Sequence, residues 1–154
     1  MRLVQRNLRM QQVDFGANAH ALTLSPALRT LLETGIHEYE DCIVLGYFDE
    51  TARRTPLTLC HDATDYEEFV NHIHVEDFLP QGFQDSDLLT QSYLYVTELE
   101  GRLARSLPDR PVDITVALSA RSCRVGFHCV RMDQAFWPED LNEFSEPTMV
   151  IHLS

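Results

Sequence analysis

The sequence predicts a single α+β domain over residues 1–154, in which a mostly antiparallel sheet packs against one long amphipathic helix. Two patterns carry this prediction. Apolar side chains recur at spacings of three and four over residues 87–107, as on an amphipathic helix, and alternate with polar ones over residues 112–119, as on a half-buried strand. A chain of 154 residues with 44% hydrophobic residues can build one core and is too short for two domains.

The N-terminal part gives one well-marked element. The first 24 residues fit neither period, and we expect a strand that ends near Phe15 and then a turn over Gly16–Ala19. Ser25 and Pro26 provide an N-cap and a first-turn proline, and Gly35 can adopt the left-handed conformation found at helix ends. A short helix is therefore predicted between Pro26 and Gly35.

The next segment predicts a pair of strands. The run CIVLGYF, residues 42–48, is β-branched and aromatic and is bounded by charges, which is typical of a central strand. Residues 49–54 are expected to form a polar turn. Residues 55–60 then return as a second strand, which Pro56 restricts to an edge or a strand start.

A second helix is predicted from a capping pattern. Thr64 and Glu67 have the spacing of a capping box, so we expect the helix to begin at Asp65. Phe69 and Val70 are expected to point from it into the core.

The second half predicts the long helix and three strands. The helix covers about residues 87–107 and ends before Pro108. Residues 112–119 and 123–132 are expected to form an antiparallel hairpin, and residues 148–153 a last strand, which together give a C-terminal β-meander.

The negative charge of the chain is concentrated in its middle third. Residues 33–87 contain fourteen carboxylates and two arginines, a balance that equals the net charge of −12 for the whole protein. Charge segregated in this way produces a directional field that steers oppositely charged partners. Solubility is served equally well by dispersed charges, so the segregation favours an acidic surface that binds a basic partner.

Composition excludes several other classes. The isoelectric point near 4.8 argues against nucleic acid as a ligand, because phosphate contacts need clustered basic residues. No apolar run could span a membrane, and the N-terminus lacks the apolar core of a secretory signal, so we expect a cytoplasmic protein. The four cysteines lack CxxC spacing and are expected to be free, buried thiols, and no cofactor motif is present.

Two histidines raise the alternative of an enzyme or a metal site. His72 and His74 would point the same way on a strand, and Glu76 and Asp77 follow as further potential ligands. The remaining candidate ligands are scattered along the chain: Cys60, His61, His128 and Cys129. A small metal-dependent or acid/base enzyme that uses His72, His74 and nearby carboxylates is thus one alternative, and an acidic adaptor or assembly factor is another.

The C-terminal segment carries a family resemblance. It begins with a strand of the type RVGFHCVR, continues through WPEDL (Trp137–Leu141), and ends in EPTMVI after Phe144. This pattern resembles the closing hairpin and strand of small acidic immunity proteins that protect bacteria against delivered toxins, including those of contact-dependent growth inhibition. The resemblance implies an inhibitor that binds a basic toxin domain, such as a nuclease, one-to-one and occludes its active site.

The partner-binding residues are expected in the acidic stretch. Its carboxylates would act as phosphate mimics or pair with lysines and arginines of the toxin, and the tyrosines among them would serve as anchors. The candidate residues are Glu38, Tyr39, Glu40, Asp41, Asp49, Glu50, Asp62, Asp65, Tyr66, Glu67, Glu68, Glu76 and Asp77.

Overall fold

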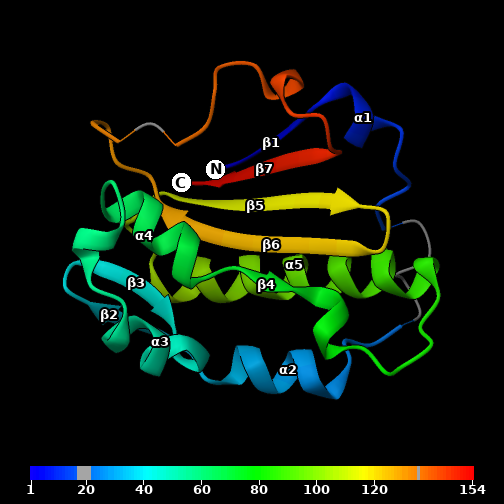
Figure 1. The fold of residues 1–154 in the computed structure, drawn as a ribbon, viewed down its shortest axis with the longest axis horizontal. Helices are drawn as coiled ribbons and strands as arrows, with labels where there is room; N and C mark the ends of the chain where they lie inside the picture. The colour runs from blue at the N-terminus through cyan, green and yellow to red at the C-terminus, as the bar shows by residue number, and fades with distance from the viewer. Residues whose placement is uncertain (17–21, 135) are drawn as a thin grey trace.

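The computed structural model describes residues 1–16, 22–134 and 136–154. In chain order its strands and α-helices are β1 (Arg2–Arg6), α1 (Leu8–Gln11), α2 (Pro26–Glu33), β2 (Ile36–Tyr39), β3 (Cys42–Leu45), α3 (Asp49–Arg54), α4 (Ala63–Val70), β4 (Ile73–His74), α5 (Asp85–Ser106), β5 (Val112–Ser119), β6 (Ser122–Cys129) and β7 (Thr148–Leu153) (Figure 1). Short 3-10 turns occupy Gly46–Phe48, Leu57–Leu59, Val75–Phe78 and Leu141–Glu143.

A five-stranded antiparallel sheet forms the centre, in the order β1-β7-β5-β6-β4. β5 and β6 pair as a hairpin over their whole length, from Val112 opposite Cys129 to Ser119 opposite Ser122. The α+β class, the long helix and the C-terminal strands are confirmed. However, β7 pairs with β5 rather than with β6. The three strands therefore lie in the order β7-β5-β6, whereas a meander would place them in the order β5-β6-β7.

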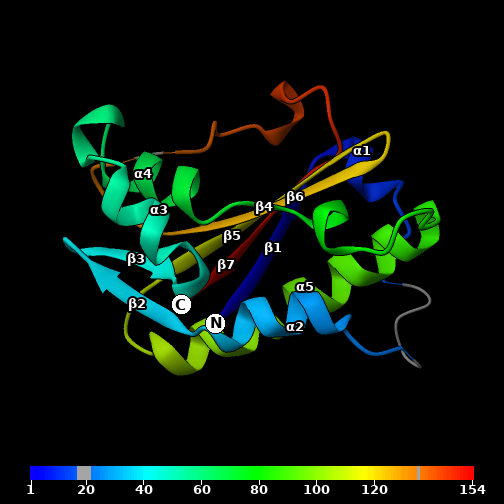
Figure 2. The ribbon, with the colours of Figure 1, turned by 60° about the horizontal axis from the view of Figure 1, so that its bottom comes forward.

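Alternation along the strands gives the sheet an apolar face and a polar face. Ile114, Val125 and Phe127 belong to the apolar face, where they share one buried core with side chains of α5 and α2. Full burial of each such side chain contributes about 1.5–3 kcal/mol relative to exposure. Figure 2 shows α2 and α5 together on one side of the sheet and the connection between β6 and β7 on the other. The polar face therefore lies under that connection.

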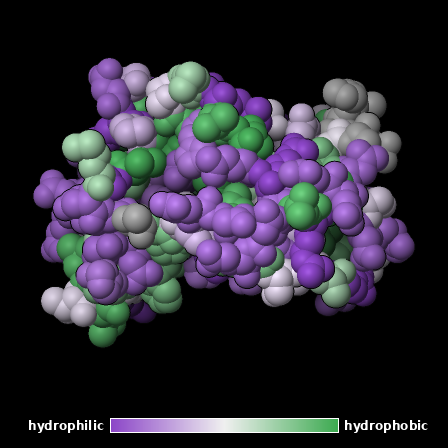
Figure 3. Space-filling model, turned by 90° about the horizontal axis from the view of Figure 1, so that it is seen from above, coloured by the Kyte–Doolittle hydropathy of each residue, from purple (hydrophilic) through white to green (hydrophobic). Residues whose placement is uncertain are grey.

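The surface seen from above, where this connection lies, is mainly hydrophilic. Figure 3 shows its apolar residues in separate groups between hydrophilic ones. No helix within the described parts of the chain is long and apolar enough to cross a membrane. Even α5, with 22 residues, has carboxylates in its first turn and Arg105 in its last.

The predicted long helix and the short helix predicted between Pro26 and Gly35 agree with the structure. α5 begins two residues before the predicted start, with Gln84 and Asp87 forming its capping box. α2 begins at Pro26 after Ser25, whose Oγ accepts a hydrogen bond from the N–H of Leu28. Gly35 follows the helix with a φ of 81°, a conformation that other residues adopt at a cost.

Three predictions for the first half are wrong. β1 ends at Arg6 rather than near Phe15, because Asn7 accepts a hydrogen bond from the N–H of Met10 and caps α1. Residues 49–54 form α3 instead of a turn, with acidic residues in the first turn and arginines in the last, as the helix dipole favours. The strand predicted over residues 55–60 is a 3-10 turn.

Other boundaries differ in smaller ways. The strand predicted over residues 42–48 ends at Leu45, because the chain turns into a 3-10 segment at Gly46. It is not a central strand, since β3 lies in a two-stranded sheet with β2, for which no strand was predicted. Of the turn expected at Gly16–Ala19, only Gly16 lies within the described residues, where it has a φ of 105°.

Helix α4 starts two residues earlier than predicted. Its cap is Asp62, whose Oδ1 accepts a hydrogen bond from the N–H of Asp65 at 2.8 Å. The buried stripe includes Tyr66, Glu67 and Val70, whereas Phe69 is 54% exposed and does not enter the core. Glu67 is therefore turned inward instead of completing a capping box.

Candidate functional site

Seven of the candidate carboxylates lie at one end of the molecule, on the β2–β3 hairpin, α3 and the start of α4. β2 and β3 form a hairpin, from Ile36 opposite Leu45 to Tyr39 opposite Cys42. Figure 1 shows this hairpin together with α3 and the start of α4 at the same end. β3 is completely buried, and Cys42 and Val44 pack with Tyr66 of α4 in a small second core. We call this region the acidic end and define it by its carboxylates: Glu38, Glu40, Asp41, Asp49, Glu50, Asp62 and Asp65.

The hairpin tip holds two exposed carboxylates in an unusual backbone conformation. Glu40 has a φ of 47° and Asp41 a φ of 66°. Two consecutive residues with positive φ are typical of a type I′ turn, for which Asn-Gly is the preferred pair. A side chain with a Cβ in the left-handed region costs about 1–2 kcal/mol per residue. The tip thus keeps two negative charges at a site where uncharged residues would stabilise the fold.

Cations of the chain pair with some carboxylates of the acidic end. Nη2 of Arg110 lies 2.7 Å from Oε1 of Glu38, and Arg54 pairs with Glu50 one helical turn away. All four of these side chains are at least 45% exposed, and exposed pairs of this kind contribute about 0–1 kcal/mol. In residues 1–16, 22–134 and 136–154, no ion pair involves Glu40 or Asp41. The tip therefore carries the least compensated charge of this region.

The remaining carboxylates of the acidic end have local structural partners. Oδ2 of Asp49, at the start of α3, lies 2.8 Å from Nδ1 of His37 on β2. Asp62 caps α4, and Oδ2 of Asp65 accepts a hydrogen bond from the N–H of His61 at 3.0 Å. Asp62 and Asp65 are half-buried, so they face solvent less openly than the tip.

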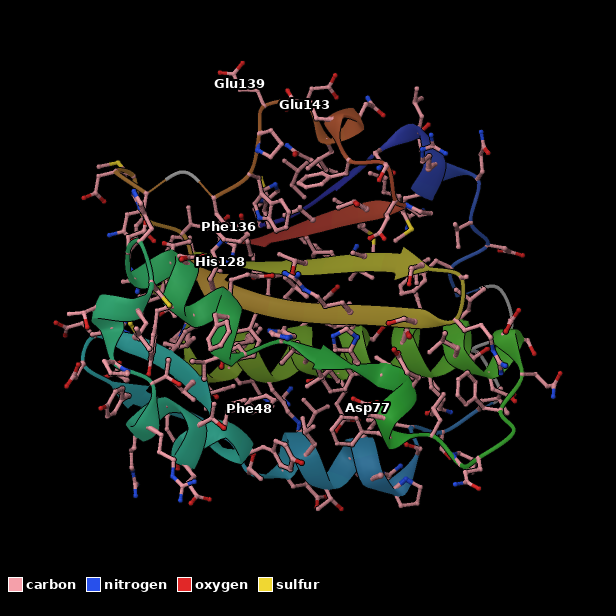
Figure 4. The ribbon with its side chains drawn as sticks, in the orientation of Figure 1. Phe48, Asp77, His128, Phe136, Glu139 and Glu143 are labelled. Atoms are coloured by element: carbon pink, nitrogen blue, oxygen red, sulfur yellow. The ribbon has the colours of Figure 1, made fainter. Side chains whose placement is uncertain are left out.

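Two candidates lie away from the acidic end. Glu76 and Asp77 belong to the 3-10 turn that follows β4, and Figure 4 shows Asp77 near α2, towards the middle of the molecule. Oε2 of Glu76 accepts a hydrogen bond from the N–H of Cys123 at 3.0 Å. Although its partial burial acts to raise the pKa of Glu76, hydrogen bonds from Ser122 and Cys123 hold that pKa below its ordinary value. Glu76 thus stabilises the fold next to β6.

Three candidates are buried, which corrects their assignment to a partner surface. Tyr66 is 0% exposed, and its hydroxyl donates to the carbonyl of Ala52 at 2.8 Å. Glu67 is 0% exposed and Glu68 is 2% exposed. None of the three reaches the surface, and Tyr39 is half-buried against the second core.

Glu67 joins the hairpin to the large sheet. Its carboxylate accepts hydrogen bonds from the N–H of Ile43 in β3 and of Cys129 in β6, both at 2.7 Å. Two nitrogens of Arg131 lie 2.8 and 2.9 Å from its oxygens, and this bidentate pairing raises the pKa of Arg131. Glu67 therefore satisfies two backbone groups and one half-buried cation at once.

Glu68 reaches the polar face of the sheet. Its carboxylate accepts hydrogen bonds from Thr115 at 2.7 Å and Arg124 at 2.9 Å, and Nδ1 of His128 lies 3.1 Å away. A Cβ on Gly126 would lie 2.8 Å from Oε1 of Glu68, so only glycine leaves room for this carboxylate. Burial acts to raise the pKa of Glu68, but the hydrogen bonds and positive partners outweigh it and hold the pKa below its ordinary value.

The same face carries a further carboxylate between two histidines. Asp113 of β5 stands opposite His128 on β6 and His152 on β7. Its carboxylate lies 2.6 Å from Nδ1 of His152 and 3.8 Å from Nε2 of His128. Glu68, His128, Asp113 and His152 thus form a continuous polar chain, which we call the buried network together with Arg124. The sequence signals for it are the glycine inside β6 and the polar residues of β5 that face away from the long helix.

The histidines proposed as metal ligands are used differently. The rings of His72 and His74 are 5.8 Å apart, yet Nδ1 of His74 lies 3.1 Å from the hydroxyl of Ser122 and Nδ1 of His72 lies 3.3 Å from the carbonyl of Glu68. Across the described residues, no group of three or more His, Cys, Asp or Glu side chains could hold a metal ion.

The cysteines are free in the described structure, and Cys42, Cys123 and Cys129 are buried. Burial raises the pKa of Cys42 and of Cys129 to about 11. These thiols therefore stay protonated at neutral pH and behave as small core residues, as predicted. Cys60 is half-buried, so the prediction of a buried thiol is wrong for this residue.

Comparison with known proteins places the chain in a family. No curated protein and no solved structure matches it. The model of the Uncharacterized protein PM0498 family matches residues 5–154, which is nearly the whole chain. The protein therefore belongs to the Uncharacterized protein PM0498 family.

Proposed function

We propose that this protein is an immunity protein, which binds a basic toxin domain one-to-one in the cytoplasm and neutralises it. The contact is made by the acidic end, with the tip of the β2–β3 hairpin at its centre. The resemblance of the C-terminal segment to immunity proteins and the segregated charge both support this function. The carboxylates would occupy the positions of substrate phosphates or pair with lysines and arginines of the toxin.

The observation that carries the proposal is the hairpin tip. Glu40 and Asp41 are exposed and both have positive φ, and among the described residues no cation forms an ion pair with either carboxylate, although Nη2 of Arg131 donates to the backbone carbonyl of Asp41 at 3.3 Å. Strain of this kind persists where it serves a function, because a type I′ turn with Asn-Gly would be more stable. A pair of carboxylates kept at this position is suited to enter a positively charged cleft.

The surrounding carboxylates can exchange partners when a toxin binds. Arg110 and Arg54 pair with Glu38 and Glu50 at the surface, where such pairs are weak and screened by salt. A toxin that presents more clustered positive charge can displace these arginines at little cost. Electrostatic attraction would then speed the encounter, and desolvated contacts near the tip would slow release.

The direct test is protection of growth. The probe is the C-terminal domain encoded by the gene directly upstream, since immunity genes lie directly downstream of their toxins. Cells that express this domain without the protein should stop growing, and cells that co-express the two should grow. Glu40→Gln combined with Asp41→Asn removes both charges at almost unchanged shape and should abolish protection while the protein stays folded.

A matched control uses carboxylates far from the acidic end. Glu139 and Glu143 are exposed on the connection between β6 and β7, as Figure 4 shows, and Glu139→Gln with Glu143→Gln should protect fully. Binding of the upstream domain without protection would support an adaptor instead. Failure of the wild-type protein to bind that domain would overturn the proposal.

A further inference from the structure

A pocket of about 370 Å³ lies on the polar face of the sheet, between β5, β6 and β7 and the connection that crosses them. Its volume lies within the range of about 300–1,000 Å³ typical of small-molecule sites. Figure 4 shows Phe136 on that connection close to His128 on the sheet. The residues that define the chemistry of the pocket are Arg124, Glu146, Thr115, Phe136, Trp137 and Phe144.

One wall of the pocket is aromatic. The rings of Phe136 and Trp137 meet edge-to-face with their centroids 4.9 Å apart, and Trp137 meets Phe144 in the same way at 5.6 Å. The Trp137 ring also stacks over His128 at 6.5 Å. These rings pack against one another and fix the position of the wall. The ring of an aromatic ligand could pack against them in the same edge-to-face or offset geometry.

Among the residues that the structure describes, the pocket offers one cation, Arg124, and one unsatisfied donor, Nε1 of Trp137, beside the exposed Glu146. The side chain of Arg124 is 42% exposed and uses one terminal nitrogen for Glu68, which leaves the rest of its planar fork free to bind. Nε1 of Trp137 is buried and has no hydrogen-bond partner within the described residues. A buried donor without a partner is costly, so an acceptor from a ligand would be stabilising.

We propose that this pocket binds a small aromatic carboxylate. The carboxylate pairs with Arg124, and a shift of the indole ring exposes Nε1 of Trp137 as a second donor, while the aromatic body of the ligand packs against Trp137 and Phe144. The buried network serves the site, because Glu68 fixes the guanidinium of Arg124 and Gly126 leaves the space that Glu68 needs. This activity is separate from toxin binding, since no carboxylate of the acidic end lines the pocket.

Trp137 makes the proposal directly measurable. It is the only tryptophan of the chain, so the indole N–H gives a single nitrogen-edited NMR signal from the site itself. Titration with 3-phenylpropionate should shift this signal saturably, with a dissociation constant on the order of 1 mM or tighter. The uncharged analogue 3-phenylpropionamide should bind about tenfold or more weakly, because it lacks the charge-assisted bond to Arg124. Phenethylamine should bind most weakly.

Variants of Arg124 distinguish binding through its guanidinium from binding through apolar packing alone. Arg124→Gln should bring the acid and the amide to equal affinity, and Arg124→Lys should restore part of the preference. Arg121→Gln is the matched control, because Arg121 lies in the same hairpin outside the pocket and contacts the carbonyl of Phe83. The remaining NMR signals report whether each variant is folded. If Arg124→Gln does not fold, the comparison of acid, amide and amine in the wild-type protein still decides.

Two results overturn the site. One is the absence of a saturable shift with 3-phenylpropionate in the wild-type protein. The other is binding of the amide or the amine as tightly as the acid, since either would show that the pocket does not recognise a carboxylate through Arg124.

Discussion

Two pairs of adjacent carboxylates, Glu40–Asp41 and Glu67–Glu68, have opposite roles in this protein. Both contribute to the charge of the middle third, and both belong to the candidate partner-binding residues. The first pair is exposed at a hairpin tip with no ion pair to any other described residue. The second pair is at most 2% exposed, and its carboxylates have seven hydrogen-bond contacts. Two of these come from backbone N–H groups of β3 and β6, and five come from side chains.

The difference teaches that net charge in a sequence does not give the charge of a surface. Glu67 and Glu68 are compensated by Arg131, Arg124 and His128, which come from a different part of the chain. A buried carboxylate with all its partners holds elements together, whereas the same carboxylate at an exposed tip is available to a partner. Mutations in the two pairs should therefore affect different properties.

The largest expected effect is on Glu67. Glu67→Ala removes the acceptor of two backbone N–H groups and leaves the half-buried Arg131 without its counter-charge. We expect a loss of about 3–5 kcal/mol in the free energy of unfolding, measured by urea denaturation. Glu40→Ala, at the exposed tip, is the control and should change that free energy by no more than about 0.5 kcal/mol. Equal effects of the two substitutions would remove the distinction between the pairs.

A smaller effect is expected for Glu68, with a defined pH dependence. Because its folded-state pKa lies below the ordinary value of 4.5, the ionised form stabilises the fold above that value, and this contribution is lost as pH falls through the folded-state pKa. Glu68→Gln should cost about 2–3 kcal/mol at neutral pH and flatten the loss of stability on the acid side. Urea denaturation over a pH series tests both. If the free energy of unfolding of Glu68→Gln fell with decreasing pH as steeply as that of the wild-type protein, Glu68 would not be the group that titrates.

Gly126 provides a coupling test of the same contact. Gly126→Ala places a Cβ against Oε1 of Glu68 and should cost about 1–3 kcal/mol. In a Glu68→Ala background the clash is absent, so the added methyl should cost little. A double-mutant cycle measures this difference. Additive effects would mean that the glycine serves some other purpose.

Much of the fold was predictable because it follows from local periodicity. The alternation in β5 and the three- and four-residue spacing of α5 mark residues whose faces are buried by the same core. The position of β7 beside β5 was not predictable, since strand order depends on contacts between distant segments and not on the pattern of any one strand. β1 likewise joins β7 across almost the whole length of the chain.

The buried carboxylates show where the site prediction failed. Thr64 and Glu67 have the spacing of a capping box, but Asp62 caps α4 instead. Glu67 falls on the buried stripe with Tyr66 and Val70, whereas Phe69, which was predicted to point inward, is exposed. The partner Arg131 was not visible in the sequence, because the contact spans 64 residues and depends on the folded sheet. The hairpin tip was not predicted as a turn either: Glu40 and Asp41 were candidates only for their charge, and no strand was expected over residues 36–39.

The smallest expected effect has the opposite sign. Glu40→Asn combined with Asp41→Gly gives the preferred pair for a type I′ turn and should raise the free energy of unfolding by about 1 kcal/mol. The same variant should lose affinity for the toxin domain. Greater stability together with weaker binding would show that the tip is strained for function. A destabilised variant would contradict the strain.

The central claim is tested most directly by the rate at which the protein associates with the upstream toxin domain over a range of ionic strength. Stopped-flow measurements on the wild-type protein should show association that slows steeply as salt is added, and Glu40→Gln with Asp41→Asn should give a slower rate and a shallower slope. The control with Glu139→Gln and Glu143→Gln should follow the wild-type curve. Association equally fast at low and high salt, or the same slope in all three proteins, would contradict recognition through the acidic end.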